Sequence, residues 1–125
     1  MGAWQDAGLS RRAALLNQTL VHVVDTYHEG PLGGEYRGLS IDVPNVDVGA
    51  FKRAEDGNGY ILRVCETVGR PVRTHIDIPL LARKLEVELG AFEIRTLYVP
   101  DEAAQRVRAV LLTELEENEK SGSAR

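Results

Sequence analysis

Three histidines, one cysteine and a pair of adjacent carboxylates are the groups in this sequence that could support catalysis or metal binding. A zinc site usually needs three or four ligands at usable spacings, whereas His22, His28 and His75 are scattered along the chain. Cys65 has no histidine beside it in sequence, which favours a small buried apolar residue over a nucleophile. We therefore expect no catalytic residue, no metal ligand and no cofactor in this chain.

Glu55 and Asp56 could imitate the carboxylate pair of a glycosidase, whose two groups must face one sugar about 5–10 Å apart. Adjacent residues of a turn point apart, however, so we expect a solvated turn. With Lys52 and Arg53, these carboxylates form a charged cluster that has two interpretations. It is either a candidate docking edge for another domain or a charged edge that resists aggregation.

The segments that position these residues show the period-2 alternation of half-buried β-strands. Gly, Pro, Asn and Asp residues separate them, and AEDGNG at 54–59 has the composition of a hairpin turn. We predict an all-β fold, an antiparallel β-sandwich of about seven to eight strands. The predicted strands are residues 20–26 and those with the apolar faces Leu39, Ile41 and Val43; Val46, Val48 and Ala50; Tyr60, Leu62 and Val64; Val72, Thr74, Ile76 and Ile78; Leu85, Val87 and Leu89; and Phe92, Ile94, Thr96 and Tyr98.

The chain length of 125 residues suits one domain. We divide it into a lead-in segment at 1–16, the β-sandwich domain at 17–116 and a disordered tail at 117–125. Residues 28–38, HEGPLGGEYRG, contain four glycines and are predicted to form a long loop that could face a ligand or a partner. The aromatics Trp4 and Tyr27 could stack on a sugar or pack on a neighbouring segment.

Composition excludes several classes of protein. Apolar residues make up 43% and charged residues 27%, as in ordinary soluble domains. The net charge of −4, without a basic tract, argues against nucleic acid as a partner. No apolar run approaches the roughly 18 residues that cross a bilayer, and the N-terminus lacks the apolar region of a signal peptide. With a single cysteine, these features predict a cytoplasmic protein.

Two stretches resemble the C-terminal β-domain of glycoside hydrolase family 38, the α-mannosidases. They are NVDVGAFKRAEDGNGYILRVCE at 45–66 and GAFEIRTLYV at 90–99, and WQDAG, LNQTL and HEGPL resemble segments that precede them. The likeness spans roughly residues 4–99. The matching residues are Lys52, Ala54, Glu55, Asp56, Ile61, Leu62, Arg63 and Glu66, then Phe92, Glu93, Ile94, Arg95, Thr96 and Leu97.

The resemblance implies an accessory domain rather than a catalytic one. In that family the zinc ligands and the catalytic aspartates lie in an N-terminal domain that this chain does not contain, so zinc is implied only for that missing domain. The implied partner is the catalytic domain of the parent enzyme, with a homodimer through the exposed docking face as a second possibility. The alternative function is a free-standing β-sandwich module that binds glycan or protein.

The resemblance also decides two structural predictions. Local propensity favours a helix at 106–115, because Asp101 can cap one, but some family members close with a strand here, so we predict a strand with helix as the alternative. Such a strand leaves Val110 and Leu112 in need of cover from a neighbouring domain or a second copy. The best-matched strands further predict that the core includes Leu62, Val64, Phe92 and Ile94.

Overall fold

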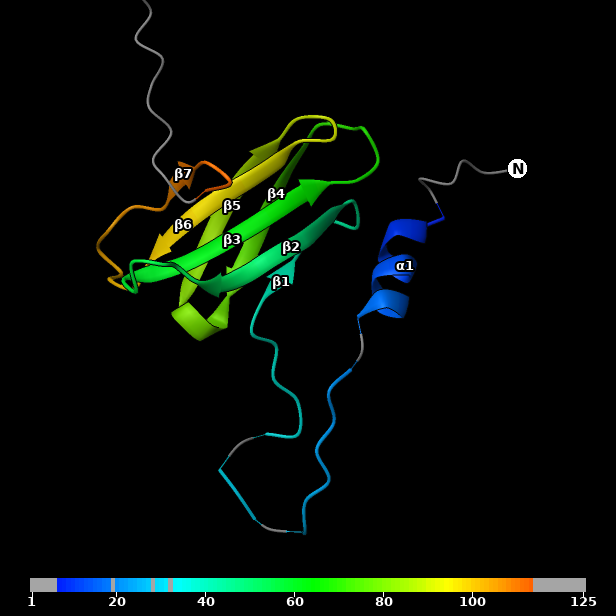
Figure 1. Ribbon diagram of the computed structural model, residues 1–125, viewed down its shortest axis with the longest axis vertical. Helices are drawn as coiled ribbons and strands as arrows, with labels where there is room; N and C mark the ends of the chain where they lie inside the picture. Colours follow the sequence, from blue (N-terminus) through cyan, green and yellow to red (C-terminus); the bar gives the residue numbers. More distant parts are fainter. Residues whose placement is uncertain (1–6, 19, 28, 32, 114–125) are drawn as a thin grey trace, which may run out of the picture.

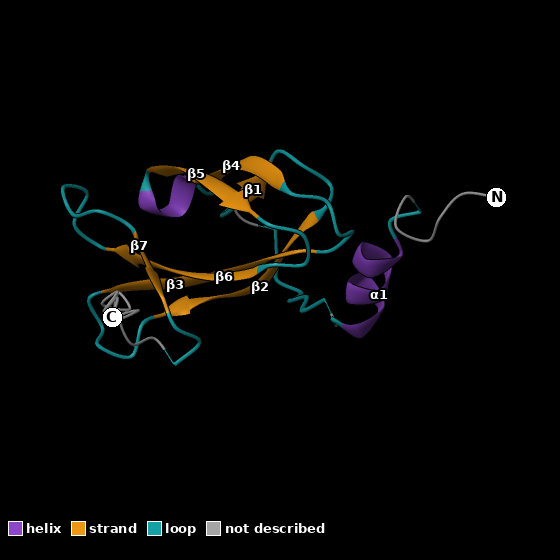
Figure 2. Cartoon of the chain, turned by 90° about the horizontal axis from the view of Figure 1, so that it is seen from above, coloured by secondary structure: helices purple, strands orange, loops and turns teal. Residues whose placement is uncertain are grey.

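The fold consists of two antiparallel sheets that pack face to face (Figure 2). The computed structural model describes residues 7–18, 20–27, 29–31 and 33–113. One sheet has the strand order β1-β4-β5 and the other β2-β3-β6-β7, which confirms the predicted antiparallel sandwich. The elements are α1 Leu9–Asn17, β1 Ser40–Ile41, β2 Val46–Arg53, β3 Gly59–Glu66, β4 Val72–Ile78, the 3-10 helix η1 Pro79–Leu81, β5 Arg83–Leu89, β6 Ile94–Pro100 and β7 Arg108–Val110.

The main core lies between the sheets and contains the apolar face predicted for most strands. Leu62 and Val64 of β3 and Ile76 and Ile78 of β4 are fully buried there. Polar residues alternate with them and face outward, because successive side chains of a strand point to opposite faces. The remaining buried members of this core are Val46, Val87, Leu89, Leu97 and Val99.

A β-bulge in β2 changes the face on which the later residues of that strand lie. The register against β3 shifts between Val48 and Ala50. Val48 packs against the main core, as predicted, but after the shift Phe51 takes the inward position and Ala50 does not. The prediction that Val46, Val48 and Ala50 share one face was therefore wrong at Ala50, because one extra residue reverses the alternation.

The inward face of β6 was also predicted in the wrong phase. Leu97 and Val99 belong to the main core, whereas Ile94 is 57% exposed on the opposite face. Phe92 precedes the strand, is 61% exposed and has a φ of 56° in the turn that leads into β6. The prediction that Phe92 and Ile94 are core residues was therefore wrong. Ile94 shares a face with Thr96 and Tyr98, but that face is the outer one, and Phe92 lies before the strand begins.

The N-terminal part of the chain differs most from its prediction. Residues 20–27 form no strand, and the segment runs away from the sheets before it returns to β1 (Figure 1). An alternating pattern becomes a strand only where a neighbouring strand accepts its hydrogen bonds, and this segment has no such neighbour among the described residues. The lead-in segment also contains α1, a helix that we did not predict despite its helix-forming alanines, leucines and arginines.

The C-terminal segment forms a strand, as predicted, although a short one. β7 pairs with β6 through Val110 opposite Thr96. Val110 is buried on the outer face of its sheet against Ala54, Ile61 and Tyr98, so the chain itself supplies the cover that we expected from a neighbour. Leu112 remains 64% exposed. The tail predicted at 117–125 lies outside the described residues.

Candidate functional site

The turn between β2 and β3, which carries the candidate docking edge, is closed by its own backbone. The N–H of Ala54 donates to the carbonyl of Gly59 at 3.0 Å, and the N–H of Gly57 donates to the carbonyl of Ala54 at 3.0 Å. Gly57 has a φ of 72°, which favours glycine. Asp56 Oδ1 accepts the N–H of Asn58 at 2.8 Å, the side-chain turn that aspartate commonly makes.

Two of the four docking-edge residues hold this turn against the end of β6 and the residue that follows it. Arg53 Nη1 donates to Asp101 Oδ1 at 2.8 Å, and Tyr98 Oη donates to Asp56 Oδ2 at 2.8 Å. The hydrogen bonds from Asn58 and Tyr98 lower the pKa of Asp56. Lys52 and Glu55 are exposed, and Lys52 lies opposite Ile61 in the ladder. The docking edge itself stays a prediction.

A polar hollow of about 390 Å³ lies beside this turn. The guanidinium of Arg108 lies 4.2 Å from the ring centroid of Tyr98, a cation–π distance. The hollow therefore combines an aromatic ring, a cation and carboxylates, which could hold a small polar ligand. Its lining residues are Asp56, Asn58, Tyr98, Asp101, Glu102, Gln105 and Arg108.

The opposite end of the sandwich contains a fully buried carboxylate, Glu66. Its side chain accepts five N–H hydrogen bonds among the described residues, four of them from backbone groups. The donors lie in the three segments that cross between the sheets, 42–45, 67–71 and 90–93, so one carboxylate joins all three crossings. The donors are Asn45 Nδ2 at 3.0 Å, Val68 N at 3.0 Å, Gly69 N at 2.8 Å, Arg70 N at 3.2 Å and Phe92 N at 2.9 Å.

These hydrogen bonds keep Glu66 ionised. Burial raises the pKa of the carboxyl, but the bonds from Phe92, Val68, Asn45 and Gly69 outweigh that effect and lower it to about 2. A carboxylate offers about four lone-pair positions, so five donors saturate it. Glu66 is therefore a structural anion with no capacity left for substrate chemistry.

The histidines are not brought together. His22 lies in the exposed segment before β1, His75 lies on β4, and His28 is outside the described residues. His75 Nδ1 lies 2.9 Å from Asp42 Oδ2, while Asp42 Oδ1 accepts Thr74 Oγ1 at 2.6 Å and the N–H of His75 at 2.9 Å. The bond from Thr74 contributes most to lowering the pKa of Asp42 to about 2. This carboxylate fastens the chain after β1 to β4.

Cys65 is the penultimate residue of β3 and is partly rather than fully buried. Burial raises the pKa of its thiol, and the nearby carboxylates of Asp47 and Glu66 add to that effect. A raised pKa reduces the thiolate fraction, which makes the side chain a poor nucleophile. Across the part of the chain that the structure describes, no group of three or more His, Cys, Asp or Glu side chains could hold a metal ion.

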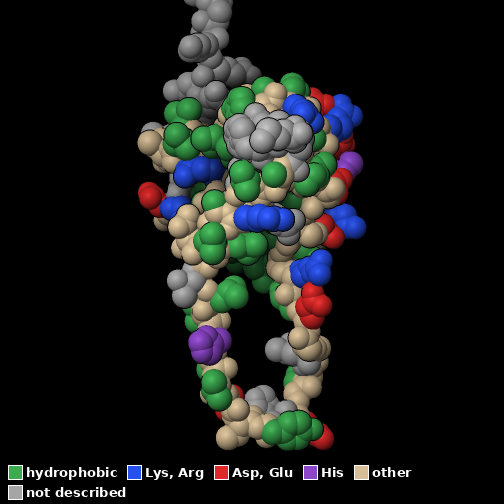
Figure 3. All heavy atoms as spheres, turned by 90° about the vertical axis from the view of Figure 1, so that its right-hand side faces the viewer, with side chains coloured by type: hydrophobic (Ala, Val, Ile, Leu, Met, Phe, Trp, Pro, Cys, Tyr) green, Lys and Arg blue, Asp and Glu red, His purple; other side chains and the backbone are tan. Residues whose placement is uncertain are grey.

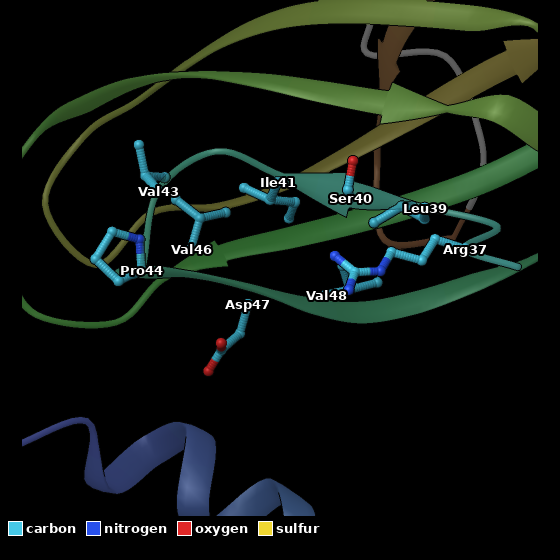
Figure 4. A pocket seen from close by; sticks show the side chains of 9 residues that line it. All are labelled: Arg37, Leu39, Ser40, Ile41, Val43, Pro44, Val46, Asp47 and Val48. Carbon is cyan, nitrogen blue, oxygen red and sulfur yellow. The ribbon is translucent and has the colours of Figure 1, made fainter. Parts of the chain in front are cut away.

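A second hollow lies on the side of the sandwich where the edges of β1 and β2 face each other (Figure 4). We call it the edge groove, and its volume is about 450 Å³. Six of its nine lining residues are apolar, but polar atoms form most of its exposed surface, and Arg37 and Asp47 are among the polar members. Its lining residues are Arg37, Leu39, Ser40, Ile41, Val43, Pro44, Val46, Asp47 and Val48.

Sequence reasoning identified the turn but missed Glu66 and Asp42 as organising groups. A signal for Glu66 was present, because Leu62, Val64 and Glu66 continue one alternating face, which places a carboxylate inward.

Comparison with protein-family models, with curated proteins and with solved structures finds no match. No helix in residues 7–18, or elsewhere in the described chain, has the length and apolar character needed to cross a membrane.

Proposed function

We propose that this chain is a non-catalytic accessory domain of an α-mannosidase of glycoside hydrolase family 38, an enzyme class that hydrolyses terminal α-mannosides. In this proposal it packs against a zinc-dependent catalytic domain located elsewhere in the parent protein. The charged docking edge of Lys52, Arg53, Glu55 and Asp56 contributes to that contact.

The observation that carries the proposal is the spatial arrangement of the two resembling stretches. β3 and β6 pair directly, with Ile61 opposite Tyr98 and Cys65 opposite Ile94. Glu66, the last residue of the first stretch, accepts the N–H of Phe92 in the second. The two stretches that resemble the family are therefore in direct contact in the fold. This contact supports a likeness between whole domains rather than a chance match of two short sequences.

The structural hydrogen bonds that the carboxylates already make support a non-catalytic role. Glu66 is saturated by its donors, Asp56 holds the turn, and Asp42 fastens a strand edge. A glycosidase needs two carboxyl groups that face a common sugar. Of the carboxylate pair that the sequence offered, Asp56 accepts hydrogen bonds from Asn58 and Tyr98 that hold the turn.

Two measurements test the proposal. The purified chain, incubated with an aryl α-mannoside and zinc or cobalt, is expected to show no turnover; activity that copurifies with the chain and disappears in a Glu55→Ala, Asp56→Ala variant would contradict it. An antibody against the chain should precipitate, from cells of its source, a much longer polypeptide with α-mannosidase activity. A precipitated protein of only 13.8 kDa without such activity would rule out the accessory role.

A glycan-binding module is the second candidate, and the polar hollow favours it. Tyr98 and Arg108 lie at its wall together with Asp56 and Asn58, groups that recognise sugar hydroxyls. This function predicts saturable binding of mannose oligosaccharides in calorimetry that Arg108→Ala weakens. No heat at millimolar oligosaccharide would exclude it.

A further inference from the structure

The segment Leu20–Tyr27 presents apolar side chains that its own domain does not cover. Leu20, Val21, Val23, Val24 and Tyr27 are between 85% and 95% exposed. Large apolar patches left in water usually mark a contact with another molecule. Figure 3 shows that this segment, which we call the arm, stands away from the sheets.

The edge groove of the same chain offers an open strand edge on which the arm could pair. β2 is an edge strand that pairs with β3 on one side only, and β1 is the corresponding edge of the other sheet. Leu39, Ile41 and Val43 line one wall, where they are partly buried against the main core, and polar atoms form most of the exposed lining. The open edge of β2 beside this groove is the kind of site that accepts an added β-strand through main-chain hydrogen bonds.

The arm has the sequence of a strand that lacks only a partner. Its eight residues would extend roughly 26 Å at about 3.3 Å per residue, with Leu20 and Val24 on one face and Val21, Val23 and Tyr27 on the other. Gly30, Gly33, Gly34 and Gly38 lie between the arm and β1, and glycine places few limits on backbone conformation.

We propose that two copies of this chain exchange arms, each arm lying in the edge groove of the other copy. Because every chain carries both an arm and a groove, a two-fold exchange covers both arms and both grooves at once and leaves no open end. Eight arm residues and nine groove residues from each protomer approach the roughly 20–30 residues per side of a stable interface. This inference does not depend on the proposed enzyme family.

Light scattering of the full chain over a dilution series tests the exchange. We expect twice the mass of one 13.8 kDa chain. The double variant Val21→Lys, Val23→Lys should weaken the dimer at least tenfold. At dilutions where both proteins are dissociated, its thermal unfolding should match that of the unaltered chain, because both side chains are about nine-tenths exposed in the single chain. Leu112→Lys is the matched control, since Leu112 is exposed beyond β7 at the other edge of the sheet, and it should leave the dimer intact.

Hydrogen exchange of residues 20–27 separates the remaining outcomes. In the dimer these amides should be protected, and the double variant should lose that protection. A monomer with protected arm amides would show that the arm closes on its own groove, which would overturn the exchange. A monomer with unprotected amides, or a dimer that the double variant does not weaken, would overturn it as well.

Discussion

The two ends of the sandwich are held by single charges of opposite sign. At one end the buried anion of Glu66 accepts N–H groups from the three sheet crossings. At the other end the cation of Arg83, at the start of β5, donates to the carbonyls of Pro100, the last residue of β6, and of Glu102 and Gln105, which follow it. Each charge thus links the two sheets mainly through backbone groups.

The difference between the two ends is exposure to water. Glu66 is fully buried, while Arg83 is partly exposed and the carbonyls of Glu102 and Gln105 lie in an exposed segment. Water can replace a lost partner at the Arg83 end but not at the Glu66 end. An unsatisfied buried polar group is expensive, whereas an exposed one is not. The hydrogen bonds of Glu66 should therefore contribute more to the free energy of unfolding than those of Arg83.

Glu66→Gln is expected to have the largest effect. The amide keeps one acceptor oxygen, but its NH₂ group then faces backbone N–H donors that cannot move away. We expect a loss of roughly 3–5 kcal/mol in the free energy of unfolding, because at least two buried N–H donors lose their acceptor, at about 1–3 kcal/mol each. Urea unfolding measures it. Asp56→Asn, a similar change at the exposed turn, is the control and should shift the midpoint far less; equal shifts would show that burial does not distinguish the two ends.

Arg83→Met tests the other end. The methionine keeps most of the apolar stem but removes the guanidinium donors, and water then hydrates the exposed carbonyls. We expect a loss of about 1–2 kcal/mol, within the range for net hydrogen bonds to solvent-accessible partners. Arg83→Lys should recover part of the lost stability. The recovery is partial because a lysine ammonium reaches fewer carbonyls than the planar guanidinium of arginine. A loss as large as that of Glu66→Gln would contradict the account.

Phe92→Ala should have the smallest effect, in contrast to the core role that its sequence suggested. Its ring is 61% exposed, so we expect a loss of about 1 kcal/mol or less, typical of surface positions. Because Phe92 has a φ of 56°, Phe92→Gly should be at least as stable as Phe92→Ala. A loss above about 3 kcal/mol for the alanine variant would restore the core interpretation.

The sequence predicted the sandwich well because alternation is a local property of each strand. β3, β4 and β5 follow their alternation closely, and Leu62, Ile76 and Val87 are buried as expected. The errors occur where a tertiary event interrupts alternation. The bulge at Val48 and Ala50 reverses the face of β2.

The candidate site was predicted less well, because its groups come from distant parts of the chain. The AEDGNG turn was predictable, since its residues are consecutive. The partners of Arg53 and Asp56 lie 48 and 42 residues away, at Asp101 and Tyr98, and no local pattern predicts such pairs. The prediction of a strand in the arm was wrong for the same reason. A strand requires a hydrogen-bonding partner, which its own sequence does not specify.

The most direct test of the central claim, that Glu66 is a structural anion joining the sheet crossings, is a carbon-detected NMR titration of its carboxyl group in the full chain. With the pKa lowered from 4.5 to about 2, the folded protein should keep Glu66 ionised as the pH falls through 4.5. The stability that it contributes is fully present above about pH 5 and is lost as the pH falls toward about 2. The free energy of unfolding should fall less steeply over that pH window in the Glu66→Gln variant, where the remaining loss comes from other carboxyls with lowered pKa, such as that of Asp42. A Glu66 carboxyl that titrates near 4.5 or above in the folded chain would contradict the account.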